Sequence, residues 1–155
     1  MEKIKNIALV AHDNCKKDLI EWVTYNYQSL VRHNLVCTGT TGTLIEAVLR
    51  DKLGEGQSDY TIKKLKTGPL GGDQQLGAMI AEGKIDVIIF LWDPMQSHPH
   101  DVDVKALLRI AVLYNVAMAC NRATADFIIS SHFMNERYMP IQTDYESYIK
   151  RPLDP

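Results

Sequence analysis

The sequence predicts an α/β fold: a single-domain, Rossmann-like or flavodoxin-like three-layer sandwich around a five-stranded, mainly parallel sheet. Two observations predict this fold. Short apolar runs recur along the chain, and amphipathic helical patterns separate them. Strand and helix alternate roughly every 25 to 30 residues, as in right-handed β-α-β crossovers that place helices on both faces of a parallel sheet. We expect residues 1–155 to form this one domain.

Five apolar runs are the expected strands, and most of them are typical of buried strands in a parallel sheet. They cover residues 7–11, 35–37, 60–65, 85–92 and 116–120. Apolar residues at helical spacing predict helices across residues 19–31, 44–49, 76–80 and 104–112. Residues 51–59 are interpreted as a surface loop, and a short helix with a frayed end is expected after Tyr145.

The composition favours a small ligand over a macromolecular partner. The 155 residues are 46% hydrophobic, and 17 basic against 19 acidic residues leave a net charge of −2. Such a chain has no diffuse attraction for nucleic acid or membrane, so any anion needs a local site. Three cysteines without CxxC spacing argue against a disulfide framework or a structural zinc site. With no apolar run long enough for a membrane span or a signal peptide, we expect a soluble, cytoplasmic protein.

Polar residues follow every expected strand. They are His12, Asp13 and Lys16 after the first, residues 38–42 after the second, residues 67–75 and 93–103 after the third and fourth, and Asn121, Arg122, Thr124 and Asp126 after the fifth. Ligands of open parallel sheets bind outside the carboxyl ends of the strands. We therefore expect the functional site at this edge.

Residues 38–42 read TGTTG and join a strand to a helix. Their glycines let backbone N–H groups approach a ligand, and three hydroxyls add donors at a helix N-terminus, which suits a phosphate group. The alternative is that Thr40 or Thr41 only caps the helix. Lys16 favours the phosphate interpretation, because a cation in the first turn of a helix opposes the dipole unless it binds an anion. The segment matches neither GxxxxGK[ST] nor GxGxxG, so ATP and dinucleotides are disfavoured.

Asp73 is the candidate general base. It follows Gly71-Gly72 in the first turn of a predicted helix, where an aspartate can also be a simple cap. Thr67-Gly68 repeats the phosphate-type turn beside it, and a base must lie within hydrogen-bond reach of a bound substrate.

The histidines at positions 98 and 100 allow two interpretations. With Asp101 and Asp103 they could ligate zinc or iron, but no third histidine has helical spacing to them. Pro99 and the carboxylates are also explained by a turn and helix capping, and one imidazole could instead polarise a carbonyl oxygen. We expect no metal and no cofactor. The remaining ring residues His33, His132, Trp22 and Trp92 are interpreted as structural.

Several ordered motifs resemble the methylglyoxal synthase family. They are AHDxCK at 11–16, TGTTG at 38–42, GPLGGDQQ at 68–75, WDP at 92–94, PHDVDVKALLR at 99–109 and NxATADF at 121–127. The resemblance runs from about residue 6 to about residue 133. It implies a lyase that converts dihydroxyacetone phosphate to methylglyoxal and inorganic phosphate without a cofactor, as a cytoplasmic homohexamer inhibited by phosphate.

The resemblance also implies roles for individual residues, with Asp73 as the catalytic base. Substrate or phosphate contacts fall to His12, Lys16, Thr38, Gly39, Thr40, Thr41, Thr67, Gly68 and His100. Within this scheme, we expect His100, with His12 as a second candidate, to stabilise the reacting oxygen and Asp103 to share proton transfer, while Asp13, Asp93 and Asp101 orient the other groups. The chain departs from the family at Thr67, where serine is common, at Val102, where proline is usual, and in a longer stretch over residues 51–66.

Two other classes remain as alternatives. A similar domain forms the effector-binding part of carbamoyl phosphate synthetase, where it binds and does no chemistry. Asp73 and His100 favour the enzyme, because a phosphate sensor does not need them. A receiver-like signalling domain would need a lysine after the fifth strand, where this chain has Asn121 and Arg122.

Overall fold

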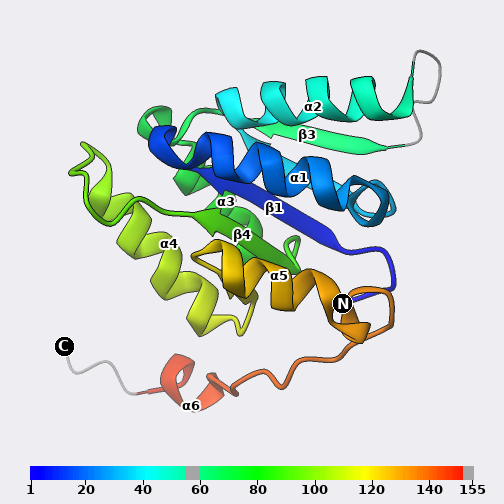
Figure 1. Ribbon diagram of the computed structural model, residues 1–155. Coiled ribbons are helices and arrows are strands. Elements are labelled where there is room, and N and C mark those ends of the chain that lie inside the picture. The colour runs from blue at the N-terminus through cyan, green and yellow to red at the C-terminus, as the bar shows by residue number, and fades with distance from the viewer. Residues whose placement is uncertain (55–59, 152–155) are drawn as a thin grey trace.

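A computed structural model describes residues 1–54 and 60–151, and five parallel strands form one sheet in this part of the chain (Figure 1). The strands are β1 (Asn6–Ala11), β2 (Asn34–Thr38), β3 (Thr61–Leu65), β4 (Val87–Leu91) and β5 (Ala117–Ala119). Their order in the sheet is β3-β2-β1-β4-β5. This is the Rossmann order rather than the flavodoxin order. The predicted α/β fold is confirmed, and the structure decides between the two variants that the sequence left open.

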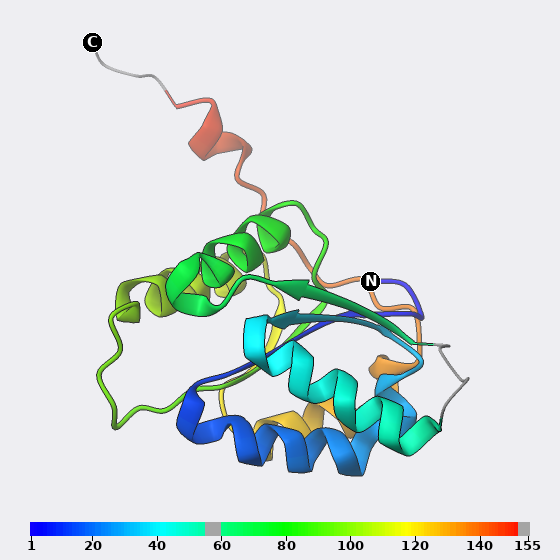
Figure 2. The ribbon, with the colours of Figure 1, turned by 90° about the horizontal axis from the view of Figure 1, so that it is seen from above.

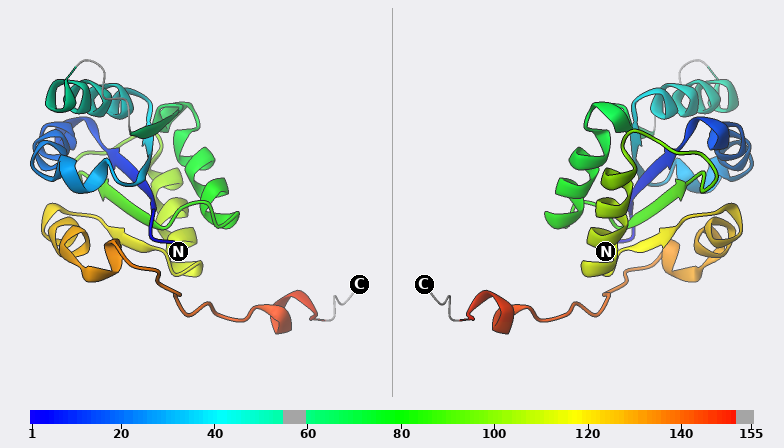
Figure 3. Two further views of the ribbon diagram at one scale, coloured as in Figure 1. Left: turned by 90° about the vertical axis from the view of Figure 1, so that its right-hand side faces the viewer. Right: turned by 90° about the vertical axis from the view of Figure 1, so that its left-hand side faces the viewer.

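Helices cover both faces of the sheet, as the alternation of patterns predicted (Figure 3). One face carries α1 (Lys16–Leu30), α2 (Gly39–Leu53) and α5 (Arg122–Ser130), and the other carries α3 (Gly72–Ala81) and α4 (Asp101–Leu113). Short 3-10 turns, η1 (Asp13–Cys15), η2 (Gly68–Leu70) and η3 (His132–Met134), complete the layers. The view along the sheet in Figure 2 shows the strands between the two helical layers.

Each strand contributes side chains to two separate cores. In β1, Ile7 and Leu9 pack on the side of α1, α2 and α5, whereas Ala8 and Val10 pack on the side of α3 and α4. The strand β4 alternates in the same way. Successive side chains of a strand point to opposite faces, so a strand covered on both faces must be apolar throughout. This is why the central runs read as continuous apolar segments.

The second helix is longer than predicted. The expected surface loop at residues 51–59 is wrong for residues 51–53, because α2 continues to Leu53, which packs against the core. The helix stops at Gly54, whose φ of 79° few other residues adopt. Arg50 and Lys52 in the last turn interact favourably with the helix dipole. Residues 55–59 of the expected loop lie outside the described residues.

The C-terminal segment leaves the body of the molecule before it forms α6 (Glu146–Ile149), the short helix predicted after Tyr145 (Figures 1 and 3). Backbone and side-chain hydrogen bonds attach it: Tyr138 N–H donates to Met1 O at 3.1 Å, and the Tyr145 hydroxyl donates to Leu113 O at 3.1 Å. The frayed end expected at residues 152–155 lies outside the described residues. Within residues 1–54 and 60–151, every helix is too short or too polar to cross a membrane.

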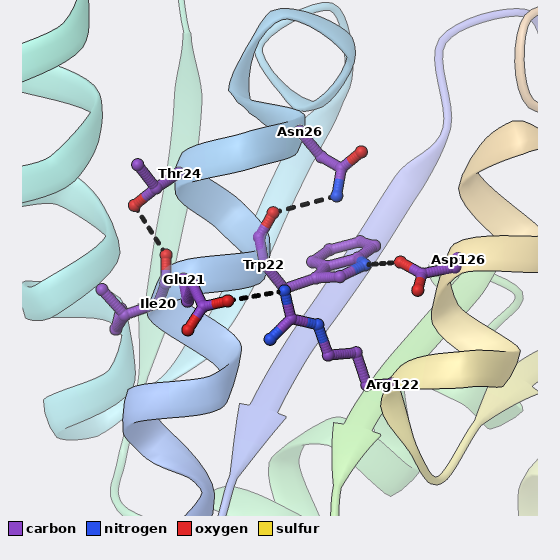
Figure 4. Close-up of polar contacts among 7 residues, drawn as sticks. All are labelled: Ile20, Glu21, Trp22, Thr24, Asn26, Arg122 and Asp126. Carbon is purple, nitrogen blue, oxygen red and sulfur yellow. Dashed lines mark hydrogen bonds and ion pairs between the residues drawn. The ribbon is translucent and has the colours of Figure 1, made fainter.

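Polar contacts join α1 to α5 on one face of the sheet (Figure 4). Trp22 is 1% exposed, and its Nε1 donates a hydrogen bond of 2.8 Å to Asp126 Oδ1. Arg122 pairs with Glu21 at 2.9 Å nearby, but this pair is exposed and contributes little. Trp22 is therefore a core residue that also uses its single polar atom.

We expect the Trp22→Phe variant to be less stable by about 1 to 3 kcal/mol, because it loses this hydrogen bond and part of a buried ring. Urea unfolding of the purified variant measures the change. Asp126→Asn is the matched control, since it keeps an oxygen acceptor for the indole and should lose much less. A Trp22→Phe protein as stable as the wild type would contradict this account.

Candidate active site

A cavity of about 390 Å³ lies at the carboxyl edge of the sheet, where β1, β2 and β4 end. Ten of the residues singled out in the sequence line it: His12, Asp13, Lys16, Thr38, Thr40, Thr41, Thr67, Gly68, Asp73 and His100. The fold thus brings together side chains that are up to about ninety positions apart in the chain, at the edge predicted by the rule for parallel sheets.

Four predicted residues do not line this cavity. Gly39 lies at the start of α2 against Thr67, so close that a Cβ at Gly39 would lie 2.4 Å from Thr67 Cγ2. Asp93 and Asp101 line a neighbouring hollow of about 260 Å³ instead. Asp103 lies in the first turn of α4, and its charge acts on Asp73.

The N-terminus of α2 and Lys16 form the polar end of the cavity. The N-cap of α2 is Thr38, and its side chain makes no capping hydrogen bond, so neither Thr40 nor Thr41 is the cap that the alternative interpretation required. The first-turn N–H groups therefore have no side-chain cap among the described residues. Lys16 Nζ pairs with Asp13 Oδ1, and this hydrogen bond is the main reason why the pKa of Asp13 is lowered.

Asp73 is buried in the cavity wall rather than used as a helix cap. It is 4% exposed in the first turn of α3, whose N-cap is Gly71. Its Oδ2 lies 3.7 Å from His100 Nε2 and has no hydrogen-bond partner among the described residues. Burial raises the pKa of Asp73, while the charge of His100 lowers it and that of Asp103 raises it. A carboxylate with few solvating partners is a stronger base than one in water.

Two glycines allow close backbone approaches in the segment before Asp73. A Cβ at Gly68 would lie 3.0 Å from both Asp73 Oδ2 and His100 Nε2, which places Gly68 against the pair. A Cβ at Gly72 would lie 2.1 Å from Lys66 O, which excludes any side chain there. Glycine is therefore required at position 72, whereas an alanine at position 68 would press on the side chains of Asp73 and His100.

His12 is held as a neutral hydrogen-bond donor. Its Nδ1 accepts the Asp93 backbone N–H at 3.2 Å, so in the neutral ring the proton resides on Nε2. That Nε2 is buried and has no partner in the described part of the chain. Burial, followed by the charges of His98 and His100, lowers the pKa of His12 to about 4. His12 can therefore supply a neutral imidazole donor in this cavity.

Five cavity residues were not among the predicted site residues: Val10, Ala11, Pro69, Phe90 and Pro99. His98, whose role the sequence left open, also lines the cavity. Phe90 lies edge-on to His12 with ring centroids 5.2 Å apart. The alternation of side chains along β4 does give a signal for Phe90, because its side chain packs on the same face of the sheet as that of Val10. Apart from the family resemblance, which assigns a contact to His100 alone, no sequence signal separates the two histidines that flank Pro99.

The other histidines lie outside the cavity. His33 is buried, and its Nδ1 accepts the Lys5 backbone N–H at 3.2 Å. His132 stacks on Phe133 in η3. In the part of the chain that the structure describes, no three His, Cys, Asp or Glu side chains are grouped so that they could hold one metal ion.

The chain is similar to proteins of one family over nearly its whole length. A family described as "MGS-like domain" matches residues 18–120. A methylglyoxal synthase from Maridesulfovibrio salexigens is 59% identical over 99% of this chain and 100% of its own length. Another from Oleidesulfovibrio alaskensis is 56% identical over 97% of each chain. The crystal structure of methylglyoxal synthase from Elizabethkingia anophelis superposes with a TM-score of 0.86 at 49% identity, and covers 99% of this chain and 95% of its own.

We expect protonation of His12 to destabilise the folded protein in acid. Its folded-state pKa of about 4 lies below the usual 6.5, so the unfolded chain binds the proton first and stability falls as the pH falls from 6.5 to about 4. The loss attributable to His12 approaches about 3 kcal/mol. Denaturant unfolding between pH 7 and pH 4 should show this loss in the wild type and not in His12→Asn, which keeps an acceptor for the Asp93 N–H. Identical pH dependence in both proteins would exclude this account; His33, whose pKa is also lowered, is present in both.

Proposed function

The chain belongs to the methylglyoxal synthase family, and we propose that it is a carbon–oxygen lyase that converts dihydroxyacetone phosphate to methylglyoxal and inorganic phosphate. One observation carries the proposal: the buried Asp73 carboxylate, whose Oδ2 has no hydrogen-bond partner among the described residues, faces His100 in the same cavity as Lys16 and the α2 N-terminus, which has no side-chain cap there. The helix N-terminus and Lys16 suit a phosphate, and the carboxylate suits a proton on carbon.

The first step is removal of a proton from the hydroxymethyl carbon of the substrate. Asp73 takes the proton, the C–H electron pair forms a carbon–carbon double bond, and the carbonyl oxygen takes the negative charge of an ene-diolate. His12, with its Nε2–H, and His100 lie in the cavity wall as donors for this oxygen. A positioned base contributes typically 10² to 10⁴ in rate, and preorganised donors contribute a comparable amount.

The second step is loss of phosphate. The hydroxyl next to the new double bond gives up its proton and becomes an aldehyde, the double bond shifts toward the phosphate-bearing carbon, and the C–O bond to phosphate breaks. The resulting enolate takes a proton on its terminal carbon, and its negative oxygen becomes the ketone of methylglyoxal. Asp103, whose charge already acts on Asp73, is our candidate to share these proton transfers.

Conformation decides between elimination and simple isomerisation. A C–O bond perpendicular to the ene-diolate plane can accept the electron pair, whereas an in-plane bond cannot. Lys16, Thr67 and the first turn of α2 hold that angle in our proposal and stabilise the leaving phosphate. Asp13 orients Lys16 by pairing with it, and the Asp93 amide orients His12. Asp101 donates its backbone N–H to His98 O and so supports the loop.

The wider properties of the family complete the proposal. We propose a cytoplasmic homohexamer of single-domain chains that works without metal or cofactor and is inhibited by inorganic phosphate. A phosphate-binding module without catalysis would need Lys16 and the first turn of α2 but not Asp73. The Asp73 carboxylate therefore distinguishes the enzyme from the binding module.

Asp73→Asn should abolish turnover while the protein still folds and binds phosphate. We expect the rate to fall by about 10² to 10⁴. Burial raises the pKa of Asp73, so the ionised group destabilises the fold above that pKa, and the neutral amide should be equally or more stable at pH 7. The assay follows free phosphate and trapped dicarbonyl together from dihydroxyacetone phosphate.

Asp18→Asn, an exposed change on α1, is the control for this experiment. Phosphate binding by the wild type without release of either product would identify a sensor rather than an enzyme. Turnover close to wild type in Asp73→Asn would transfer the role of base to Asp103.

Gly68→Ala tests the close approach at the catalytic pair. Its methyl group would lie 3.0 Å from the reacting oxygen of Asp73 and from His100 Nε2. We expect turnover to fall by at most about 10², which is the loss that a misplacement of about 1 Å can cause, with a small change in stability. Gly77→Ala in α3, whose Cβ would lie 4.0 Å from Ile110 Cγ2, should keep full activity. Equal activities of the two variants would show that the Asp73–His100 geometry tolerates displacement.

A further inference from the structure

His98 is the cavity residue to which the mechanism above gives no role. It belongs to the loop between β4 and α4, and its ring stacks on His12 with centroids 3.8 Å apart and planes tilted by 41°. The ring of His100 lies farther away, at 5.6 Å. His98 therefore covers the part of the cavity around His12, while His100 faces Asp73.

His98 lines the same cavity as Lys16 and Asp13, which belong to its polar end. The pKa of Asp13 is lowered mainly by its hydrogen bond with Lys16, and to a smaller extent by the charge of His98. His98 thus acts on the same ion pair that we assign to the phosphate group. Its neighbours also include His12 and Asp93, whose pKa values respond to it.

The loop holds the His98 ring in a fixed position. Pro99 restricts the backbone of the residue before it to extended conformations, and His98 O accepts the Asp101 N–H at 3.2 Å at the start of α4. Asn14 donates to Asp93 Oδ2 at 2.8 Å and to Gln96 Oε1 at 2.9 Å, which attaches the loop to η1. These contacts hold the backbone of the loop, and the stack on His12 positions the ring.

One polar atom of this ring has no partner in the described part of the chain. His98 Nε2 is buried and makes no hydrogen bond there. Its stacking neighbour His12 offers no acceptor, because His12 Nδ1 already accepts the Asp93 amide. Buried polar atoms are rarely left unpaired, and a bound ligand is one explanation for an exception in the wall of a cavity. A ligand oxygen is the partner that this cavity can supply.

We propose that His98 is a further substrate-binding residue, whose imidazole donates a hydrogen bond to the phosphate group of the bound ligand. It complements Lys16 and the first turn of α2, which hold the same group. The inference rests on the proposed function for the identity of the phosphate ester, but inorganic phosphate alone is enough to test it.

A purely aromatic role is the competing explanation, since the stack could serve only to hold His12. His98→Phe keeps a ring of similar shape and removes both nitrogens, whereas His98→Gln keeps a donor near the position of Nε2. His98→Ala removes ring and donor together. Ser97→Ala is the control for disturbance of the loop, because Ser97 is exposed and lies outside the main cavity.

The experiment measures phosphate binding by calorimetry and the kinetics with dihydroxyacetone phosphate for the five proteins, after thermal unfolding confirms that each is folded. We expect His98→Phe and His98→Ala to weaken phosphate binding roughly tenfold or more and to raise KM similarly, with kcat within about threefold. His98→Gln should recover most of the affinity, and Ser97→Ala should match the wild type.

Wild-type phosphate affinity in His98→Phe would overturn the proposal. A loss of kcat in His98→Ala, restored in His98→Phe at unchanged phosphate affinity, would also overturn it and assign the ring to the support of His12. Absence of turnover in every protein, wild type included, would reject the proposed function, and the phosphate titrations would still decide the role of His98.

Discussion

The site depends on keeping one carboxylate out of water while leaving it within reach of a ligand. Asp73 meets this constraint in the first turn of α3, where its carboxylate is buried and lies 3.7 Å from His100. The surrounding chain is arranged accordingly, because the backbone at Gly68 and Gly72 comes too close for any side chain to be added without displacement. Burying a charged carboxylate opposes folding. The two apolar cores must therefore provide the stability that offsets this cost.

Burial shifts two titratable groups of the cavity in opposite directions. It raises the pKa of Asp73 and lowers that of His12, because it disfavours the charged form of each group. The carboxyl becomes a better base, and the imidazole stays a neutral donor. The Asp93 amide decides which nitrogen of His12 is the donor, because its N–H donates to Nδ1 and leaves the imidazole proton on Nε2. One physical cause thus separates the base from the donors that serve it.

The parallel sheet explains why phosphate binding and proton transfer share one cavity. All its strands end at the same edge, so Lys16 after β1, the first turn of α2 after β2 and Asp73 after β3 are neighbours in space. The loop after β4 adds His98 and His100 from the remaining side. Helix N-termini lie at this edge by the same geometry, and they favour anions without any net charge on the protein. The net charge of −2 is therefore no obstacle to binding a phosphate ester.

The sequence by itself determined the fold class, the edge where the site lies and most of its polar residues. Apolar periodicity reports burial on one or both faces, and the rule for parallel sheets converts strand ends into a site. Tertiary structure alone decided the Rossmann strand order, the continuation of α2 to Leu53, and the difference between His98 and His100. It also decided that Asp73 is buried rather than a cap. These features depend on contacts between segments that are far apart in the sequence, and a local sequence pattern does not specify which segments come into contact.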